Sequence, residues 1–212
     1  MSGLKIPYLN ELTPNDSKFT SSRLMASGAQ IKIDKINWNE FPHLIEAKVY
    51  IGYNDQFLWL HYQIGGELIR AVCLADQEPV WQDSCVEFFI QQGDFYRNFE
   101  FNTLGVCLSA CGADRHSRES LDKDSLAQIL RFPSFTPETL HEAETPQEWT
   151  LTVAIPLNLI GLKAGSDFRA NFYKCGDESS VPHYISWFPI GTINPDFHQP
   201  AYFGLLKLED KV

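Results

Sequence analysis

The chain has 212 residues and a formal net charge of −10 at pH 7. This length suits one domain with a sizeable core, so we expect a single domain over residues 1–212. The negative charge argues against nucleic acid and anionic membrane surfaces as partners, because both are bound mainly through Lys and Arg. A neutral ligand fits better, and the five Trp, eight Tyr and fifteen Phe exceed the needs of the core and leave some rings for a stacking surface.

The five cysteines lie in or beside apolar runs, and their number is odd. Buried free thiols therefore explain them better than a disulfide framework, and a reducing compartment is consistent with that. The first residues show no basic segment followed by a long apolar stretch. We therefore expect neither a signal peptide nor a membrane anchor, and a cytoplasmic location for the sequence as it stands, although a chain trimmed of its leader would look the same. The oligomeric state is left open.

Apolar residues recur with a period of two, which is typical of half-buried strands. Residues 47–64 show this best: Val49, Ile51 and Tyr53 alternate with polar or small residues, "NDQ" turns the chain, and 57–64 return as a second strand. Further predicted strands are 68–74, 84–90, 96–102, 105–111, 149–155, 168–174, 184–188 and 202–208.

The spacing of these roughly eight to twelve short strands, without alternating long helices, predicts an all-β fold: an immunoglobulin- or jelly-roll-like antiparallel β-sandwich. One or two short helical turns are expected. Residues 122–130 are predicted as a short helix capped by Asp122 or Asp124, and 156–161 as a single turn that begins at a proline. The charged segment 114–124 is predicted to be a surface excursion.

Alternation along strands 84–90 and 96–102 places polar side chains on one face and apolar side chains on the other. If these strands pair in one sheet, Glu87, Glu100 and Asn102 share a polar surface. Such a surface suits hydrogen bonds to sugar hydroxyls, a cation, or acid–base chemistry. A solvated sheet face that carries charges and has no function is the alternative.

Glu87 and Glu100 are also candidates for a glycoside-hydrolysing acid pair, which needs two carboxyl groups about 5 to 10 Å apart. However, the sequence shows no nucleophile elbow, P-loop, H-E-x-x-H or dinucleotide fingerprint. Cys107, Cys111 and His116 suggest zinc, but strand residues four apart lie about 13 Å apart, so core thiols explain the two cysteines better.

Two tryptophans lie near loops. A tryptophan in such a place can stack on the C–H face of a pyranose while carboxylates and amides bind its hydroxyls. Trp81 and Trp187 are the candidates. Trp59 and Trp149 are predicted to be core residues, and Trp38 is expected to pack near the sandwich edge.

Several stretches, in this order, resemble the family 9 carbohydrate-binding modules. The resemblance extends from about Ile31 to Leu208 and implies a β-sandwich that binds sugars, often at a chain end, with a pyranose ring between two tryptophans. The stretches that carry it are "NDQFLWLHYQI", "WQDSCVEFFI", "NFEFNTLG", "EWTLTVAIPLNLIG", "FRANFYKCG", "ISWFPI" and "PDFHQPAYFGLLKL".

The resemblance also implies which residues bind the ligand. Trp81 and Trp187 are similar to the sandwiching pair, and Glu87 is similar to the carboxylate that binds hydroxyls. The whole implied set is Trp81, Glu87, Glu100, Asn102, Asn171, Lys174 and Trp187. A mono- or oligosaccharide is the implied partner. No catalytic residue, metal ligand or cofactor is implied, although the oxygen-rich loop 176–180 leaves a structural calcium ion open.

One departure from the family is that its members can carry an arginine where this chain has Glu100. Members are also commonly attached to enzymes that degrade xylan or glucan, which links them to polysaccharide breakdown. We therefore expect a non-catalytic carbohydrate-binding module. The alternatives are a hydrolase of O-glycosyl bonds, or a domain associated with one, and a sandwich that has lost sugar binding and serves protein interaction.

Overall fold

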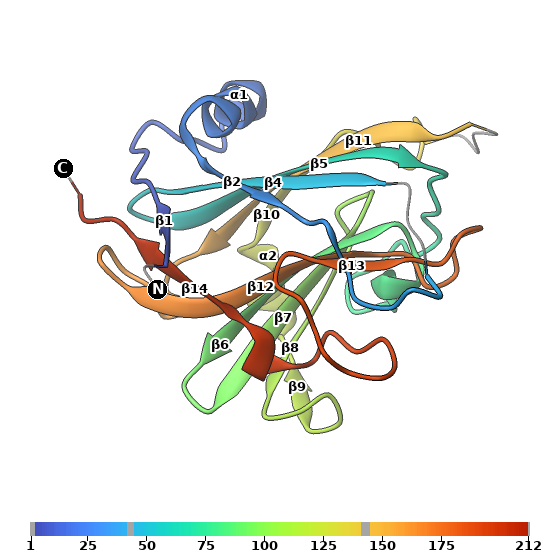
Figure 1. The fold of residues 1–212 in the computed structure, drawn as a ribbon. Coiled ribbons are helices and arrows are strands. Elements are labelled where there is room, and N and C mark those ends of the chain that lie inside the picture. Colours follow the sequence, from blue (N-terminus) through green and yellow to red (C-terminus); the bar gives the residue numbers. More distant parts are fainter. Residues whose placement is uncertain (1–2, 42–44, 141–144, 212) are drawn as a thin grey trace.

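The larger of two facing β-sheets carries the elements that build the site (Figure 1). The computed structural model describes residues 3–41, 45–140 and 145–211. Within them the larger sheet has nine strands. Its main path runs β1 (Leu4–Ile6), β14 (Gly204–Leu208), β12 (Asp167–Cys175), β6 (Cys85–Gln92), β7 (Phe95–Asn102), β8 (Cys107–Gly112) and β9 (Arg118–Ser120). Off this path, β13 (Tyr184–Ser186) pairs with β12, and β3 (Lys35–Ile36) pairs with β13.

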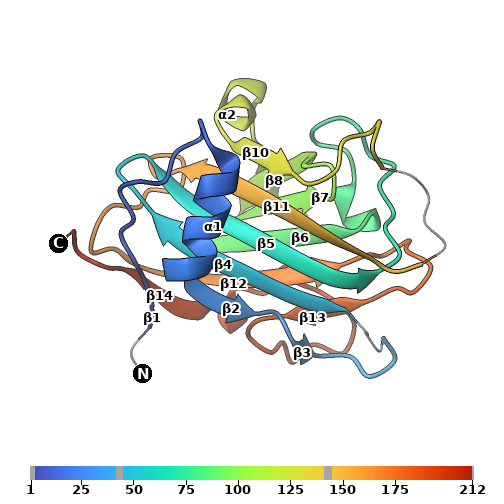
Figure 2. The same cartoon turned by 90° about the horizontal axis from the view of Figure 1, so that it is seen from above.

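The smaller sheet covers one face of the larger one (Figure 2). Its order is β10 (Leu130–Pro133), β11 (Gln147–Pro156), β5 (Phe57–Glu67), β4 (Glu46–Tyr53) and β2 (Ala29–Lys32). Strands β4 and β5 form the predicted hairpin. Among the strands of the described residues, pairing is antiparallel except between β1 and β14, which run parallel, and an isolated parallel bridge joins Tyr8 to Tyr53. The predicted all-β sandwich is therefore confirmed.

The main core lies between the sheets and follows from the alternation of each strand. Val86, Phe88 and Phe172 from the larger sheet are buried in one cluster with Leu60 and Leu151 from the smaller sheet. At about 25 cal/mol for each Å² of apolar surface removed from water, these large side chains supply the main driving force for bringing the sheets together.

The opposite face of the larger sheet carries a second apolar cluster that loops cover. Phe89, Tyr96 and Tyr173 project from this outer face, and the segment after β13 packs over them with Phe197 and Phe203. The Tyr173 and Phe197 rings stack with centroids 4.2 Å apart. Because apolar side chains fill both faces of this region, the outer face is a platform for loops rather than a solvated surface.

The first helix, α1 (Ser17–Ser27), lies across the outside of the smaller sheet (Figure 2). Asp16 caps it by accepting a hydrogen bond from the Phe19 N–H group. Leu24 packs against Trp59 and Ala154. Helix α1 could not be predicted from the sequence, because few of its side chains are apolar and buried and its amphipathic pattern is weak.

Most predicted strands are confirmed, and the two expected helical segments differ. The first, α2 (Lys123–Ala127), is a short helix capped by Asp122, as predicted. Residues 157–161 form turns and no helix. In the part of the chain that the structure describes, no helix is long and apolar enough to span a membrane.

The predicted strand 68–74 is wrong, because this segment is a loop. Its backbone N–H groups are bound by side chains instead of by a neighbouring strand. The Asp83 carboxylate accepts hydrogen bonds from Val72 and Cys73, and Glu78 accepts from Leu74. The apolar letters that suggested a strand include Val72 and Leu74, whose side chains are exposed.

Candidate functional site

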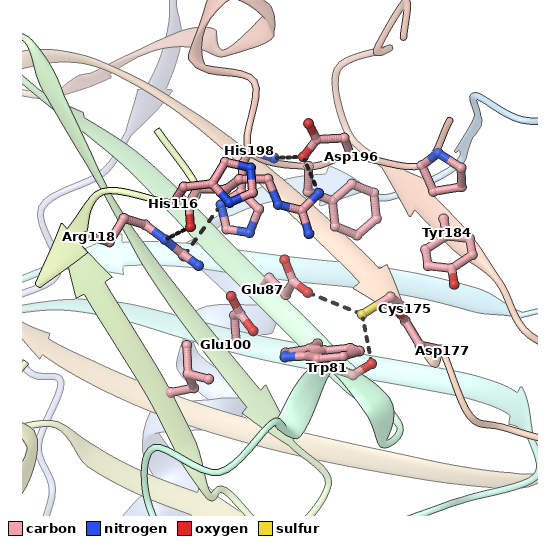
Figure 3. Close-up of a pocket in the computed structure, with 14 residues that line it drawn as sticks. Trp81, Glu87, Glu100, His116, Arg118, Cys175, Asp177, Tyr184, Asp196 and His198 are labelled. Carbon is pink, nitrogen blue, oxygen red and sulfur yellow. Dashed lines mark hydrogen bonds and ion pairs between the residues drawn. The ribbon is translucent and has the colours of Figure 1, made fainter. Parts of the chain in front are cut away.

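A cavity of about 340 Å³ opens on the outer face of the larger sheet (Figure 3). Its floor is formed by Glu87 on β6, Glu100 on β7 and Cys175 on β12. Its walls are formed by the short helix η1 (Val80–Gln82) and by the loops around residues 115–118 and 195–198. The predicted pairing of the two glutamate strands is confirmed, since Glu87 and Glu100 are direct cross-strand partners.

Both floor carboxyl groups are buried and incompletely hydrogen-bonded. Each glutamate is 3% exposed. Glu87 Oε1 accepts from the Cys175 thiol at 3.1 Å, and Glu100 Oε1 accepts from Asn98 Nδ2 at 3.0 Å. The Oε2 atom of each has no hydrogen-bond partner among the described residues. An unsatisfied buried carboxyl oxygen costs free energy, so both atoms favour a ligand that donates hydrogen bonds.

Burial also changes the acid–base behaviour of the floor. Desolvation raises the pKa of Glu87 well above its usual value, and the neighbouring Cys175 and Glu100 raise it further. Desolvation raises the pKa of Glu100 to about 7, although the Arg118 guanidinium opposes this. The floor therefore holds fewer negative charges at neutral pH than two ordinary glutamates would.

Aromatic rings line the walls around these carboxyl groups. Trp81, carried by η1, is 38% exposed and lines the cavity. Tyr184 and Phe197 also line it. Figure 3 shows the Glu87 and Glu100 carboxyl groups between Trp81 on one side and the histidine-bearing loops on the other. Aromatic walls above polar groups are a general arrangement for binding a small ring-shaped ligand.

Four basic or imidazole side chains also line the cavity, and none of them is among the predicted ligand-binding residues. They are Arg115, His116, Arg118 and His198. Arg118 Nη1 donates to Asn98 Oδ1 at 2.9 Å, so the guanidinium lies near Glu100. Desolvation and the charge of Arg118 lower the pKa of His198 to about 3, which keeps that imidazole neutral.

Three of these side chains come from segment 114–124, which was predicted to be a surface excursion and of which only His116 was considered as a ligand, for zinc. The Arg and His residues that cluster in this segment are the sequence signal from which these side chains could have been predicted. Arg118 also bears on the departure noted at Glu100: this position has no arginine, but Arg118 on β9, two strands away, brings its guanidinium close to Glu100.

The structure brings together three of the seven predicted ligand-binding residues, namely Trp81, Glu87 and Glu100. Asn102 is buried beside them, but its amide is fully used. Its Nδ2 donates to Cys73 O and Asp83 Oδ2, and its Oδ1 accepts from the N–H groups of Leu104 and Val106. The predicted contact of Asn102 with a sugar is therefore not favoured, and its role here is to hold the loops that flank the strand.

Asn171 and Trp187 lie away from this cavity. Asn171 is buried, and its side chain binds the backbone N–H and C=O groups of Phe188. The half-buried Trp187 contacts the core residue Phe172 and lines a shallow hollow with Leu4. Trp81 and Trp187 thus do not enclose this cavity between them, in contrast to the facing pair expected from the resemblance.

Lys174 is fully buried on the core side of β12. Its Nζ donates to Glu67 Oε1 and to Cys175 O, both at 2.7 Å, and to His183 Nε2 at 2.9 Å. Glu67 Oε2 in turn accepts from Trp149 Nε1 at 2.8 Å. Lys174 therefore links the two sheets and does not reach the cavity.

The remaining tryptophans and the cysteines agree largely with expectation. Trp59 and Trp149 are buried, as predicted, and Trp38 is buried in the second apolar cluster. All five cysteines are free thiols. Cys107 is buried in the main core, as expected.

A two-sheet sandwich with an aromatic and acidic cavity on one outer face is the architecture of a module that binds a small ligand. The sequence profile of carbohydrate-binding family 9 matches residues 21–208, so the chain belongs to this family. No curated protein matches the chain.

Similar solved structures support this assignment. A candidate carbohydrate-binding protein from Bacteroides uniformis has 32% identity and a TM-score of 0.89, over 98% of this chain and 100% of that one. Two structures of a family 9 module from Caldicellulosiruptor kristjanssonii share the fold at low identity. The cellotriose complex has 12% identity and a TM-score of 0.64, over 99% of this chain and 94% of that one. The glucose complex has 13% identity and a TM-score of 0.61, over 99% and 96%.

Proposed function

We propose that the chain is a non-catalytic module that binds a sugar in the cavity above Glu87 and Glu100. One observation carries this proposal: two buried carboxyl oxygens that have no hydrogen-bond partner in the described part of the chain lie on the floor of an open cavity beside the exposed Trp81 ring. Sugar hydroxyls donate the hydrogen bonds that these oxygens lack. The C–H face of a pyranose suits the indole ring.

Family membership and the structural neighbours support the same ligand class. The Caldicellulosiruptor kristjanssonii module was solved with glucose and with cellotriose. A cavity of about 340 Å³ has room for a monosaccharide ring or the end of a longer chain. The Arg118 guanidinium and the Asp177 carboxyl group at the same cavity supply further polar groups for hydroxyls.

Isothermal titration calorimetry with glucose and cellotriose tests the proposal. We expect heat of binding from the wild type and an affinity about tenfold lower in Trp81→Ala, because an aromatic stacking contact contributes about 0.5–1.5 kcal/mol beyond its buried area. Trp187→Ala is the matched control and should bind as the wild type does. Binding that depends on Trp187 and not on Trp81 would contradict the proposal.

Glycoside hydrolysis by Glu87 and Glu100 is a second candidate, because a glycosidase needs one carboxyl group with a raised pKa and the pKa of Glu100 is about 7. Turnover of aryl glycosides that disappears in both Glu87→Gln and Glu100→Gln would support it. Sugar binding without any turnover would leave the binding module as the function.

A further inference from the structure

A group of metal-ligating atoms lies at the floor of the cavity and shares one residue, Glu87, with the proposed sugar site. The atoms are the thiols of Cys85 and Cys175 and a carboxylate oxygen of Glu87, and all of them lie within 4.8 Å of one another. Cys85 and Cys175 are direct partners across β6 and β12. Glu87 follows two residues after Cys85 on the same outward face.

From this arrangement we propose that Cys85, Cys175 and Glu87 form a binding site for a single thiophilic divalent cation, with Zn²⁺ as the physiological candidate. Two thiolates and one carboxylate provide three of the four ligands that zinc prefers. Zinc ligand atoms lie about 3.5–3.8 Å apart around a tetrahedral ion, given Zn–S bonds of about 2.3 Å. The observed separations therefore need only small side-chain adjustments.

The ion would replace the hydrogen bond from the Cys175 thiol to Glu87 Oε1 at 3.1 Å, and the other contacts of the two thiols are weak. Cys85 Sγ points to Val86 O at 3.7 Å, and Cys175 Sγ points to Trp81 O at 3.6 Å. Both distances are near the outer limit for a sulfur hydrogen bond. Glu87 Oε2 has no partner among the described residues, although Glu87 is almost fully buried. An ion bound through Glu87 Oε1, the oxygen nearest Cys175 Sγ, would leave Oε2 for a sugar hydroxyl and one coordination position for water or a ligand atom.

The cavity gives the ion a path to the site, because Glu87 and Cys175 both line it. The other three cysteines do not join a comparable group among the described residues. Cys107 lies in the main core, and Cys111 lies half-buried on β8. The chain therefore contains both the site and a matched control thiol.

Cobalt titration tests the site, because Co²⁺ occupies zinc sites and Co–thiolate bonds absorb in the near ultraviolet. Reduced protein, freed of metal with a chelator and kept without sugar, is titrated with CoCl₂. We expect a thiolate charge-transfer band that saturates at one Co²⁺ per chain and disappears when Zn²⁺ is added. Cys111→Ser should behave as the wild type does, whereas Cys175→Ser should lose the band.

Because Cys175 is buried, Glu87→Gln provides an independent test if Cys175→Ser does not fold. This variant keeps the side-chain volume and both thiols, and it should bind Co²⁺ at least tenfold more weakly. A wild type without the band, a folded Cys175→Ser that keeps it, or a Glu87→Gln variant with unchanged Co²⁺ affinity would overturn the proposal. None of these outcomes depends on whether the chain binds sugar.

Discussion

Glu100 is a buried, ionisable residue of the proposed ligand site, and its burial makes stability depend on pH. Its carboxyl group is buried, and its pKa is raised to about 7, chiefly by desolvation. The folded state therefore binds a proton that the unfolded chain, with a pKa near 4.5, releases at lower pH. The contribution of Glu100 to stability is fully present below about pH 4.5 and is lost as the pH rises through about 7.

Glu100→Gln should remove this dependence, because glutamine imitates the protonated acid at every pH. As the pH rises from about 4 to about 8, the free energy of unfolding of the variant should increase by about 3 kcal/mol relative to that of the wild type. Urea unfolding at both pH values measures the gain. His198, whose pKa is lowered to about 3, gives the opposite slope, so the difference between the two proteins is needed to isolate Glu100 together with its effect on the pKa of Glu87. A difference that stays constant with pH would contradict the account.

The loop before β6 is the element that positions Trp81. It is irregular, and the buried Asp83 carboxylate holds it by accepting from the N–H groups of Val72 and Cys73 and by an ion pair with Arg70. The Asn102 amide binds both this carboxylate and the loop backbone. Side-chain acceptors thus do here what a neighbouring strand does in a sheet.

Asp83→Ala should loosen this loop and destabilise the protein. Two N–H groups and one amide lose their acceptor, and we expect a loss of about 3–5 kcal/mol in the free energy of unfolding. Urea unfolding measures the loss, and limited proteolysis should show new cleavage within residues 68–79. Glu78→Ala is the matched control: Glu78 lies on the same loop and is exposed, so its removal should cost about 1 kcal/mol or less. Equal effects of the two changes would contradict this role of Asp83.

The strands could be predicted from the sequence because their alternation is regular. This alternation also placed Glu87 and Glu100 on one face, which the structure confirms, although Phe89 and Tyr96 make much of that face apolar. Loop 68–74 could not be predicted, because its apolar residues follow the pattern of a strand. In the structure its backbone N–H groups donate to the side chains of Asp83 and Glu78.

The cavity walls were harder to predict for a similar reason. Arg118 on β9 and His198 in the loop after β13 line the cavity from segments that are distant in sequence, and only the folded chain brings them together. The resemblance suggested that Trp187 forms a wall of the ligand site. Alternation along a strand shows on which face of the sheet a side chain lies, but it does not show in which direction a ring beside a loop points. In the structure this tryptophan packs against Phe172.

At the scale of the whole molecule, a buried ion pair joins the two sheets. Lys174 on β12 binds Glu67 on β5 at 2.7 Å, and both side chains are almost fully buried. The Lys174 Nζ atom also lies 5.9 Å from the centre of the Trp149 ring. Breaking such a pair is costly, because the charge that remains is buried without compensation.

Lys174→Met should therefore destabilise the protein by about 3–5 kcal/mol. The double variant Lys174→Met with Glu67→Gln should recover part of this loss, because glutamine carries no charge and still offers an acceptor to Trp149 Nε1. Urea unfolding of the two variants measures both effects. Sugar affinity should not change in the folded variants, because Lys174 does not line the cavity. A double variant less stable than Lys174→Met would contradict this account of the pair.

A crystal structure with bound glucose or cellotriose tests the central claim most directly. The account predicts a sugar ring against Trp81, with hydroxyl groups within hydrogen-bonding distance of Oε2 of both Glu87 and Glu100. A sugar bound elsewhere, for example against Trp187 with the cavity above the two glutamates left empty, would contradict it.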